Sequence, residues 1–454
     1  MRSVLEAIRE ALVSIPPTSV LPRPGPGSPD KGGGERERMV LPLKGGGGKD
    51  KRSVSCVIGA VGVLALLVST APAEGAKRAK GDPTSVLARN GELIAAARVA
   101  GEMPTDPGDG RFGNAAPLTV RLYPQTATEP RAEKSVERSA AVRAIHADTW
   151  IAFLVEWADP DRSDVKEGTT DTFADAAALQ FPLKYGEAGD RLPYVGMGEP
   201  GRPVNIWLWR DGGNAAGNLT TESPRPRGGG EGKGEGAGGR AGKEVNDVLR
   251  ASAGTSLSAR GFGTLEPAAG GSVRTAGKWE NGRVRVLFAR SFGASSPEEV
   301  KFAPRQIGLV PVAIAVWGGE KGERGGLKTL SGWRFVKFDG GKVNPAYVRS
   351  FGWNPRIRGD AKTGAALMTR HGCAGCHAYP GNPIPTKIGP GLAGIGGIHR
   401  PGYLFESLKN PSAVIVPHGN YYSMKDGQPV SLMAPFSGPE RDAYHIVEFL
   451  RTLK

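Results

Sequence analysis

The chain has 454 residues, which is enough for two or three domains, and it carries a formal net charge of +14. Such a charge is typical of nucleic-acid-binding proteins, but the basic residues are scattered and no basic motif with interleaved aromatic residues is present. Nucleic acid is therefore excluded as a partner. The three cysteines, Cys56, Cys373 and Cys376, are too few for a protein-held iron–sulfur cluster, which needs about four thiolates.

Residues 1–73 are predicted to be a leader that carries a secretory signal peptide. A basic flank at residues 49–52 precedes an apolar core at residues 54–68, and an Ala-Pro-Ala sequence at residues 71–73 has the small-x-small pattern of a cleavage site. We therefore expect export to the periplasm or to the outer side of the cell membrane. The alternative is an uncleaved anchor, for which the apolar run is rather short, and only in that case is membrane contact expected.

Residues 74–115 are rich in Gly, Ala, Pro and charged residues and are predicted to be a linker. Short β-rich runs follow over residues 116–345 and indicate an antiparallel β-sandwich. The Glu-Asn-Gly sequence at residues 280–282 is typical of a hairpin turn, and only residues 135–147 suggest a helix. Strands are predicted at residues 118–123, 149–157, 204–209, 284–290 and 310–317.

A Gly-rich segment at residues 222–243 is predicted to be a disordered surface insertion in the sandwich. A second linker is expected at residues 346–357, and residues 358–454 are predicted to form a small helical domain. The apolar positions of its last helix recur at helical spacing. The predicted fold class is therefore mainly β plus all-α. The helices are expected at residues 361–370, 402–409 and 438–453.

The segment Cys373-Ala-Gly-Cys376-His377 is the attachment motif of c-type haem. Two thiols at this spacing can add to the two vinyl groups of a haem, and the imidazole that follows is then placed to bind the iron. A redox dithiol or a zinc knuckle has no need of a His directly after the second Cys. The motif therefore predicts covalent haem c, and predicted export agrees because c-type haem is attached outside the cytoplasm.

Residues 358–454 resemble a class I cytochrome c domain along their whole length. The resemblance rests on the helix that leads into the Cys pair, on Gly-Pro-Gly-Leu at residues 389–392 and on Met-Ala-Pro-Phe at residues 433–436. It implies that His377 is the proximal iron ligand, that the Gly-Pro segment packs on the same side, and that Met433 is the distal ligand. A thioether is neutral and holds the redox potential high. Met424, in the same loop, is the alternative distal ligand.

The sandwich region carries four short motifs whose order resembles the ethylbenzene dehydrogenase-related haem b-binding domain. This domain is the γ subunit of periplasmic molybdoenzymes of the dimethyl sulfoxide reductase family. The resemblance implies a haem b at one end of the sandwich, with Met197 and Lys328 as its axial ligands. The motifs are Leu-Gln-Phe-Pro at 179–182, Gly-Met-Gly at 196–198, Ala-Val-Trp at 315–317 and Arg-Gly-Gly-Leu-Lys at 324–328.

Elimination supports Met197 independently. Between residues 74 and 370 the only His is His146, which excludes a pair of His ligands, and the only Met residues before Met368 are Met103 and Met197. A Lys can bind iron only as the neutral amine, and an apolar site favours that form by lowering a pKa that is ordinarily about 10.4. Lys278 is the alternative to Lys328.

The two resemblances together imply an exported dihaem electron-transfer subunit, similar to the γ subunit of a nitrite oxidoreductase or nitrate reductase. The implied partners are a catalytic subunit with a molybdenum cofactor, an iron–sulfur subunit, and a soluble cytochrome or another component of the respiratory chain. No Gly-x-Ser-x-Gly elbow, zinc triad or phosphate loop is present, so no substrate chemistry is expected in this chain. Two alternatives stay open: a haem c carrier whose sandwich binds a ligand or partner without haem b, and a haem peroxidase-like enzyme.

Overall fold

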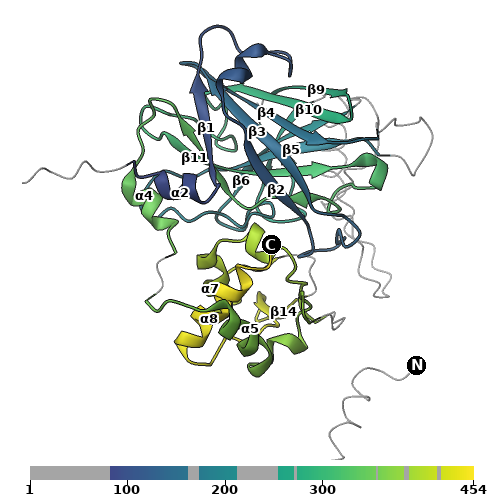
Figure 1. Ribbon diagram of the computed structural model, residues 1–454, viewed down its shortest axis with the longest axis vertical. Coiled ribbons are helices and arrows are strands. Elements are labelled where there is room, and N and C mark those ends of the chain that lie inside the picture. The colour runs from purple at the N-terminus through teal and green to yellow at the C-terminus, as the bar shows by residue number, and fades with distance from the viewer. Residues whose placement is uncertain are drawn as a thin grey trace, which may run out of the picture. The chain divides into compact units, whose positions relative to one another are not determined.

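The computed structural model describes residues 82–161, 173–211, 254–269, 273–353, 356–382, 388–416 and 421–454. The predicted leader and the predicted Gly-rich insertion lie outside these ranges. We call the strand-rich part within residues 82–353 the β domain and the part within residues 356–454 the helical domain (Figure 1). In the described ranges, no helix combines the length and the apolar character that crossing a bilayer requires.

The β domain is one 13-stranded sheet, with strand order β8-β7-β6-β5-β11-β12-β2-β3-β4-β10-β9, in which β13 pairs with β11 and β1. Neighbouring strands are antiparallel except β1, which pairs in parallel with both β3 and β13. The strands are β1 (Leu93–Arg98), β2 (Leu118–Pro124), β3 (Arg138–His146), β4 (Trp150–Ala158), β5 (Ala176–Pro182), β6 (Val204–Arg210), β7 (Gly254–Ala259), β8 (Glu266–Pro267), β9 (Arg274–Glu280), β10 (Arg283–Ser291), β11 (Leu309–Trp317), β12 (Thr329–Leu330) and β13 (Arg334–Phe338).

The sheet folds back on itself, so that its two halves enclose one core. Strand β11 belongs to both halves, since its first residues pair with β13 and its last with β5. Phe153 of β4 packs against Phe181 of β5 and Trp207 of β6, with ring centroids 5.8 and 6.1 Å apart, although these strands lie in opposite halves. Burial of each such side chain stabilises the fold by about 1.5–3 kcal/mol. The prediction of a mainly antiparallel β domain is confirmed.

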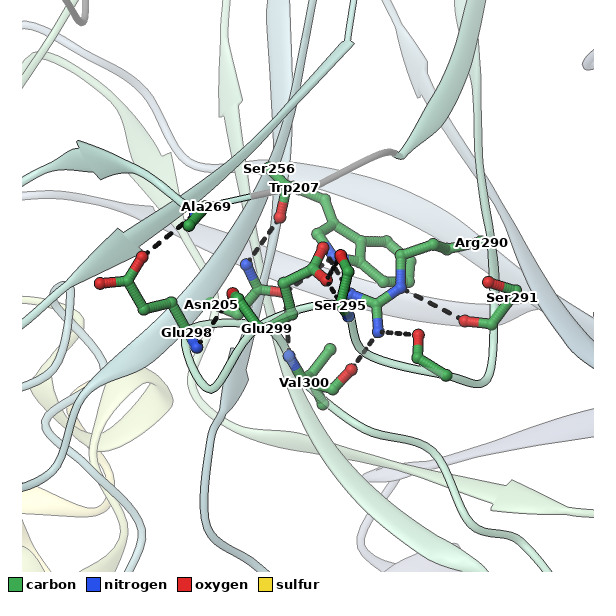
Figure 2. A network of polar contacts seen from close by, with 12 residues as sticks. Asn205, Trp207, Ser256, Ala269, Arg290, Ser291, Ser295, Glu298, Glu299 and Val300 are labelled. Carbon is green, nitrogen blue, oxygen red and sulfur yellow. Dashed lines mark hydrogen bonds and ion pairs between the residues drawn. The ribbon is translucent and has the colours of Figure 1, made fainter.

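A buried polar network joins the two halves of the sheet (Figure 2). The guanidinium of Arg290 in β10 lies 3.5 Å from the carboxylate of Glu299 and donates to the backbone carbonyl of Val300. The side-chain oxygen of Asn205 in β6 accepts from the indole of Trp207 at 2.9 Å and from the N–H of Val300 at 3.2 Å. A buried ion pair costs desolvation energy unless its groups find such partners, and here they tie β6 to β10.

The segment predicted as a linker at residues 74–115 is instead largely folded. It contains helix α2 (Ser85–Arg89), strand β1 and the 3₁₀ helix η1 (Gly110–Asn114). Leu87 and Ile94 are fully buried in the core of the β domain. The linker prediction is therefore wrong for the described part of this segment.

The second predicted linker, residues 346–357, begins with helix α4 (Pro345–Ser350), which packs on the β domain. Its N-cap is Asn344, whose side chain accepts the N–H of Ala346 at 3.0 Å. Tyr347 is buried and packs edge-on against Phe351, with ring centroids 4.5 Å apart. The prediction of a linker is wrong over these residues.

The helix suggested at residues 135–147 is strand β3. Ala140, Val142 and Ala144 are fully buried at alternate positions, and β3 pairs along its length with β2 and β4. The hairpin prediction is confirmed, because β9 and β10 meet at Asn281 and Gly282, whose φ angles are 52° and 71°.

The helical domain has a separate core shared by α5, α7 and α8. Helix α5 begins after Asp360, whose side chain accepts the N–H of Thr363 at 2.7 Å. The three helices predicted in this region are confirmed. The elements are helices α5 (Ala361–Arg370), α6 (Ile395–Ile398), α7 (Pro401–Lys409) and α8 (Glu440–Leu450), the 3₁₀ helix η3 (Cys373–Gly375), and strands β14 (Tyr422–Lys425) and β15 (Gln428–Ser431). The 3₁₀ helix η2 (Gly319–Lys321) belongs to the β domain. The core of the helical domain includes Leu367, Leu404, Leu408, Ile446 and Val447.

Candidate haem-binding sites

One cavity of about 900 Å³ is lined by residues of both the β domain and the helical domain. Its size lies near the upper end of the range of ligand pockets, about 300–1,000 Å³. The β domain contributes apolar side chains from β6, β7 and β11 to its wall, among them Ile206, Leu208, Leu257 and Ala313. Six of the candidate ligand and attachment residues line this cavity: Met197, Lys328, Cys373, Cys376, His377 and Met433.

Met197 lies in a loop after β5 with a φ of 73°, a left-handed conformation that is uncommon for a residue other than Gly. Gln180 of β5 holds this loop from two sides: its Oε1 accepts the N–H of Met197 at 3.1 Å, and its Nε2 donates to the carbonyl of Val195 at 2.9 Å. The carbonyl of Met197 accepts the N–H of Gly261 at 2.9 Å. These hydrogen bonds offset a backbone strain of about 1–3 kcal/mol.

Lys328 comes directly before β12, and its Nζ lies 4.0 Å from the Sδ of Met197. The ammonium position is 5.1 Å from the centre of the Trp317 ring and 5.8 Å from that of Phe262. Burial lowers the pKa of Lys328 to about 8, and no carboxylate of the described residues offsets this effect. The lowered pKa favours the neutral amine, which is the form that can bind a metal.

The segment that carries Lys328 is fixed by Gln125, the residue that follows β2. The backbone N–H of Gln125 donates to the carbonyl of Lys328 at 2.9 Å, and its side-chain Nε2 donates to the carbonyl of Gly326 at 3.1 Å. A Cβ at Gly326 would lie 2.8 Å from the carbonyl oxygen of Pro130, so only Gly fits there. The Arg-Gly-Gly-Leu-Lys motif therefore places Lys328 through close backbone contact.

Lys278, the alternative to Lys328, lies elsewhere. It is in β9, its side chain is 53% exposed, and its Nζ forms an ion pair with Glu280 at 3.1 Å. Lys278 does not line the cavity. The structure thus brings Met197 together with Lys328 and not with Lys278.

Two glutamines that support the candidate ligands, Gln125 and Gln180, were not identified from the sequence. Gln180 interrupts the apolar strand β5, in which every residue is buried. A polar side chain in such a strand must find hydrogen-bond partners, since an unsatisfied buried polar group costs about 1–3 kcal/mol. That exception in an apolar run is the signal by which Gln180 could have been found.

The Cys pair lies in and directly after η3, at the end of α5. The N–H of His377 donates to the carbonyl of Cys373 at 3.1 Å, which closes the turn. The side chain of Asn382 donates to the carbonyls of Ala374 at 2.9 Å and His377 at 3.0 Å. Cys373 is half-buried and Cys376 is exposed, and the two are not joined in a disulfide. Both cysteines belong to the lining of the cavity.

The imidazole of His377 packs against the Gly-Pro segment at residues 389–390. A Cβ at Gly389 would lie 2.8 Å from Cε1 of His377, so the segment approaches the ring more closely than any other residue would allow. Nδ1 of His377 lies 2.9 Å from the carbonyl oxygen of Pro390. A proton on Nδ1 donated to this carbonyl leaves the lone pair of Nε2 for a metal. Burial lowers the pKa of His377 and so favours the neutral ring.

The two candidate distal ligands differ in position. Met433 is half-buried against the core of the helical domain, and its N–H donates to Oγ of Ser431 at 3.1 Å. Met424 is in β14, is 63% exposed and does not line the cavity. The structure therefore brings Met433, and not Met424, into the cavity with His377.

Both donor sets fit the haem groups that the motifs imply. The 4.0 Å between Sδ of Met197 and Nζ of Lys328 is comparable with two N and S bonds to one metal atom, each about 2.0–2.3 Å. Met197 and Lys328 would hold haem b, while Cys373, Cys376, His377 and Met433 would hold haem c. Among the described residues, no group of three His, Cys, Asp or Glu could bind a bare metal ion.

Three curated relatives are similar to the chain. A protein provisionally named respiratory nitrate reductase heme subunit, from Haloferax mediterranei, is 25% identical over 288 residues, which cover 63% of this chain and 87% of that protein. The gamma subunit of chlorate reductase from Ideonella dechloratans is 27% identical over 196 residues, or 42% of this chain and 61% of that protein. The gamma subunit of dimethylsulfide dehydrogenase from Rhodovulum sulfidophilum is 23% identical over 241 residues, or 52% and 75%.

A solved carbohydrate-binding module of family 9 from Caldicellulosiruptor kristjanssonii, in complex with glucose, aligns with 58% of this chain and 100% of its own at 10% identity. Its TM-score of 0.26 is too low to support any inference on fold or ligand. Residues 110–329 match the family model described as ethylbenzene dehydrogenase. This match confirms the predicted resemblance of the β domain to that family, over residues that include Gln180, Met197 and Lys328.

Proposed function

We propose that the chain is a dihaem electron-transfer subunit of an exported molybdoenzyme complex, similar to the γ subunit of a nitrite oxidoreductase or nitrate reductase. It relays electrons between the iron–sulfur clusters of a partner subunit, haem b in the β domain, haem c in the helical domain and an external cytochrome. The observation that carries this proposal is that the Met197–Lys328 pair and the His377–Met433 pair line one cavity.

The names of the relatives support an electron-transfer role for this chain rather than a catalytic one. One is named as a heme subunit and two as gamma subunits of enzymes that act on chlorate and dimethylsulfide. Because these enzymes are named for different substrates, the feature that their gamma subunits can share with this chain is the supply or removal of electrons. The catalytic step then belongs to a molybdenum-cofactor subunit, with an iron–sulfur subunit between the two.

The residues of the cavity are suited to hold an electron-carrying haem and to exclude a substrate. Bound haem supplies a one-electron redox centre at each site. Met197 with Lys328, and His377 with Met433, would hold the two haems with two donor side chains each, so that neither site would be left open to a substrate. The apolar wall excludes water and favours the neutral forms of Lys328 and His377.

A peroxidase-like enzyme needs an open iron position and a distal acid–base residue. His146 is the one His in the described part of the β domain, and it lies at the end of β3, outside the cavity lining. Its ring packs edge-on against Phe338, with centroids 5.1 Å apart. This position argues against the peroxidase alternative.

Residues 358–454 are, in this proposal, a class I cytochrome c domain joined to the haem b domain. The thiols of Cys373 and Cys376, the Nδ1 contact of His377 and the position of Met433 support it. Attachment of haem c requires export, which the N-terminal signal peptide at residues 1–73 would direct to the periplasm. Fusion of the two domains removes one diffusional step by raising their effective concentration.

The test is a count of the two haem types in the native protein. Acid–acetone extraction followed by the pyridine haemochrome assay should give one extractable b-type haem and one c-type haem that stays with the chain. A c-type haem alone would favour the β domain as a ligand- or partner-binding module. Sequencing the N-terminus of the mature protein tests export, and mass spectrometry of the subunits that copurify with it tests the partners.

A further inference from the structure

The helical domain contacts the β domain at the level of the backbone. A Cβ at Gly332, between β12 and β13, would lie 2.4 Å from the carbonyl oxygen of Ile398 in α6. A Cβ at Gly397 in α6 would lie 2.2 Å from the ring of Tyr123 in β2. Real Cβ atoms do not approach other atoms this closely, so both positions accept only Gly. Helix α6 therefore lies directly on the β domain, with its backbone against the backbone at Gly332 and against the ring of Tyr123.

Charged side chains fix the same contact. Arg400, which follows α6, has its Nη1 3.2 Å from Oε1 of Glu92 in the β domain, and its Nη2 donates to the carbonyl of Phe351 at 2.8 Å. Its side chain is only 18% exposed. Arg191, in the loop that leads to Met197, pairs with Glu406 of α7. Complementary charges of this kind set the register of an interface, because a shifted position would leave them unpaired.

An aromatic stack with rings from both domains lies in the cavity wall. The ring of His399 lies nearly parallel to that of Tyr403 in α7, with centroids 4.3 Å apart and a 18° angle between the planes. The ring of Tyr194 in the β domain lies 5.5 Å from that of His399 at 22° and 6.0 Å from that of Tyr403. All three rings line the cavity, and Tyr194 precedes Met197 by one turn of its loop. Burial lowers the pKa of His399 to about 3, so the stack is uncharged at neutral pH.

We infer that these contacts hold the helical domain in one docked position, in which electrons cross directly between the two haems through their common cavity. This inference rests on the proposed dihaem function. In each crossing, iron(II) at one site becomes iron(III) while iron(III) at the other becomes iron(II), and no bond or proton is exchanged. His399, Tyr194 and Tyr403 are positioning residues, since they keep the two sites at a constant separation and exclude water from the wall between them.

A docked pair of domains and a flexibly tethered pair predict different dependences of the interhaem transfer rate on solvent viscosity. In a tethered pair, the transfer rate depends on how often the domains meet, which falls with linker length and solvent viscosity. In a docked pair, the separation is fixed before the electron moves, as in other preorganised reactions. The interhaem rate of the native full-length chain should therefore be independent of viscosity.

The experiment uses pulse radiolysis of the full-length chain loaded with both haems. A small radical donor reduces the protein, and absorbance then follows the redistribution of the electron between haem c and haem b. Gly332→Ala and Gly397→Ala place a methyl group inside the interface, on the β-domain side and on the helical side. The matched control is Gly402→Ala in α7, where nothing lies within 4 Å of an added Cβ.

We expect redistribution about tenfold slower or more in both interface variants, with haem content, spectra and midpoint potentials unchanged, because a small displacement of reacting centres has large kinetic effects. The Gly402→Ala rate should equal that of the native chain. Native rates in variants that keep both haems would overturn the docking and leave the dihaem function intact. A single haem per chain would overturn both. Where the interface variants do not fold, a native rate that falls in proportion to added glycerol viscosity would overturn the docking by itself.

Discussion

The two candidate haem sites are built in opposite ways. In the helical domain, both candidate attachment thiols and the candidate proximal ligand lie within five consecutive residues, 373–377, so local geometry alone brings them together. In the β domain, Met197 and Lys328 are 131 residues apart, and their donor atoms meet only because β5 and β12, whose loops carry them, both pair with β11. The first site should therefore tolerate changes in the fold and resist loss of haem. The second should depend on every contact that shapes its two loops.

The largest expected effect separates covalent from non-covalent attachment. Cys373→Ser, which removes one thioether, should abolish most haem staining of the chain after denaturing electrophoresis, while the b-type haem stays extractable from the native protein. Cys376→Ser should behave in the same way. The measurement is peroxidase-based haem staining beside a pyridine haemochrome assay. Undiminished staining in either variant would place the attachment elsewhere.

Met197→Ala should remove the low-spin haem b spectrum and spare haem c, because the β domain has no other Met in its cavity lining. Met103→Ala is the matched control: Met103 belongs to the β domain but packs against a separate apolar cluster. The measurement is the reduced-minus-oxidised absorbance spectrum of each variant. An intact b-type spectrum in Met197→Ala would show that haem b, if bound, takes a different ligand.

Much of the fold could be predicted from the sequence because its signals are local. The apolar runs of β4, β6 and β11 and the periodic apolar positions of α8 mark their own elements. Strand β1 could not be found in this way, since its six residues, Leu-Ile-Ala-Ala-Ala-Arg, are extended only because they pair in parallel with β3 and β13. Strand β3 could not be found for a related reason. Its Ala residues are small on both faces of the strand, so the sequence does not show the alternation that is visible in the burial of its side chains.

The same contrast holds for the sites. The Cys373–His377 turn could be predicted from chemistry, because its spacing suits one cofactor. Nothing in the spacing of Met197 and Lys328 predicts that they meet, and they were identified through a family resemblance. The choice between Lys328 and Lys278 needed the structure, since it depends on which lysine faces the cavity.

Lys328 makes the stability of the β domain depend on pH when haem b is absent. Its pKa is about 8 in the folded chain and 10.5 ordinarily, so between these values the unfolded chain binds more protons than the folded one. Folding is therefore penalised below pH 8, and the free energy of unfolding should rise as the pH increases toward 10.5, by at most about 3 kcal/mol.

Urea denaturation of the chain after extraction of haem b, at pH values from 7 to 10.5, measures this rise. Lys328→Met keeps a side chain of similar length without the charge, and should flatten the pH dependence and raise the stability at pH 7. Lys278→Met is the control, because Lys278 is exposed and paired with Glu280. Equal pH dependence in the Lys328→Met variant and the native chain would contradict the assignment of a buried, unpaired amine. The proposed haem c site should add no such dependence, because thioether bonds do not titrate.

The smallest effect concerns Gln180, which touches no haem in the proposal and acts only through the backbone of Met197. Gln180→Leu removes both hydrogen bonds that hold residues 195–197, and each is worth about 0.5–1.5 kcal/mol. Because Met197 occupies a strained conformation, with a φ of 73°, the loop should relax and the thioether should lose its position. The expected result is weaker retention of haem b and a shifted b-type midpoint potential, with an unchanged potential for haem c in the same molecule.

Gln180→Glu keeps the acceptor for the Met197 N–H and should restore part of the native potential, which a purely packing role for Gln180 does not predict. If both variants keep the native b-type potential, the left-handed turn at Met197 is maintained by the hydrogen bond from Gly261 alone. The Met197–Lys328 site would then depend less on Gln180 than its hydrogen bonds indicate.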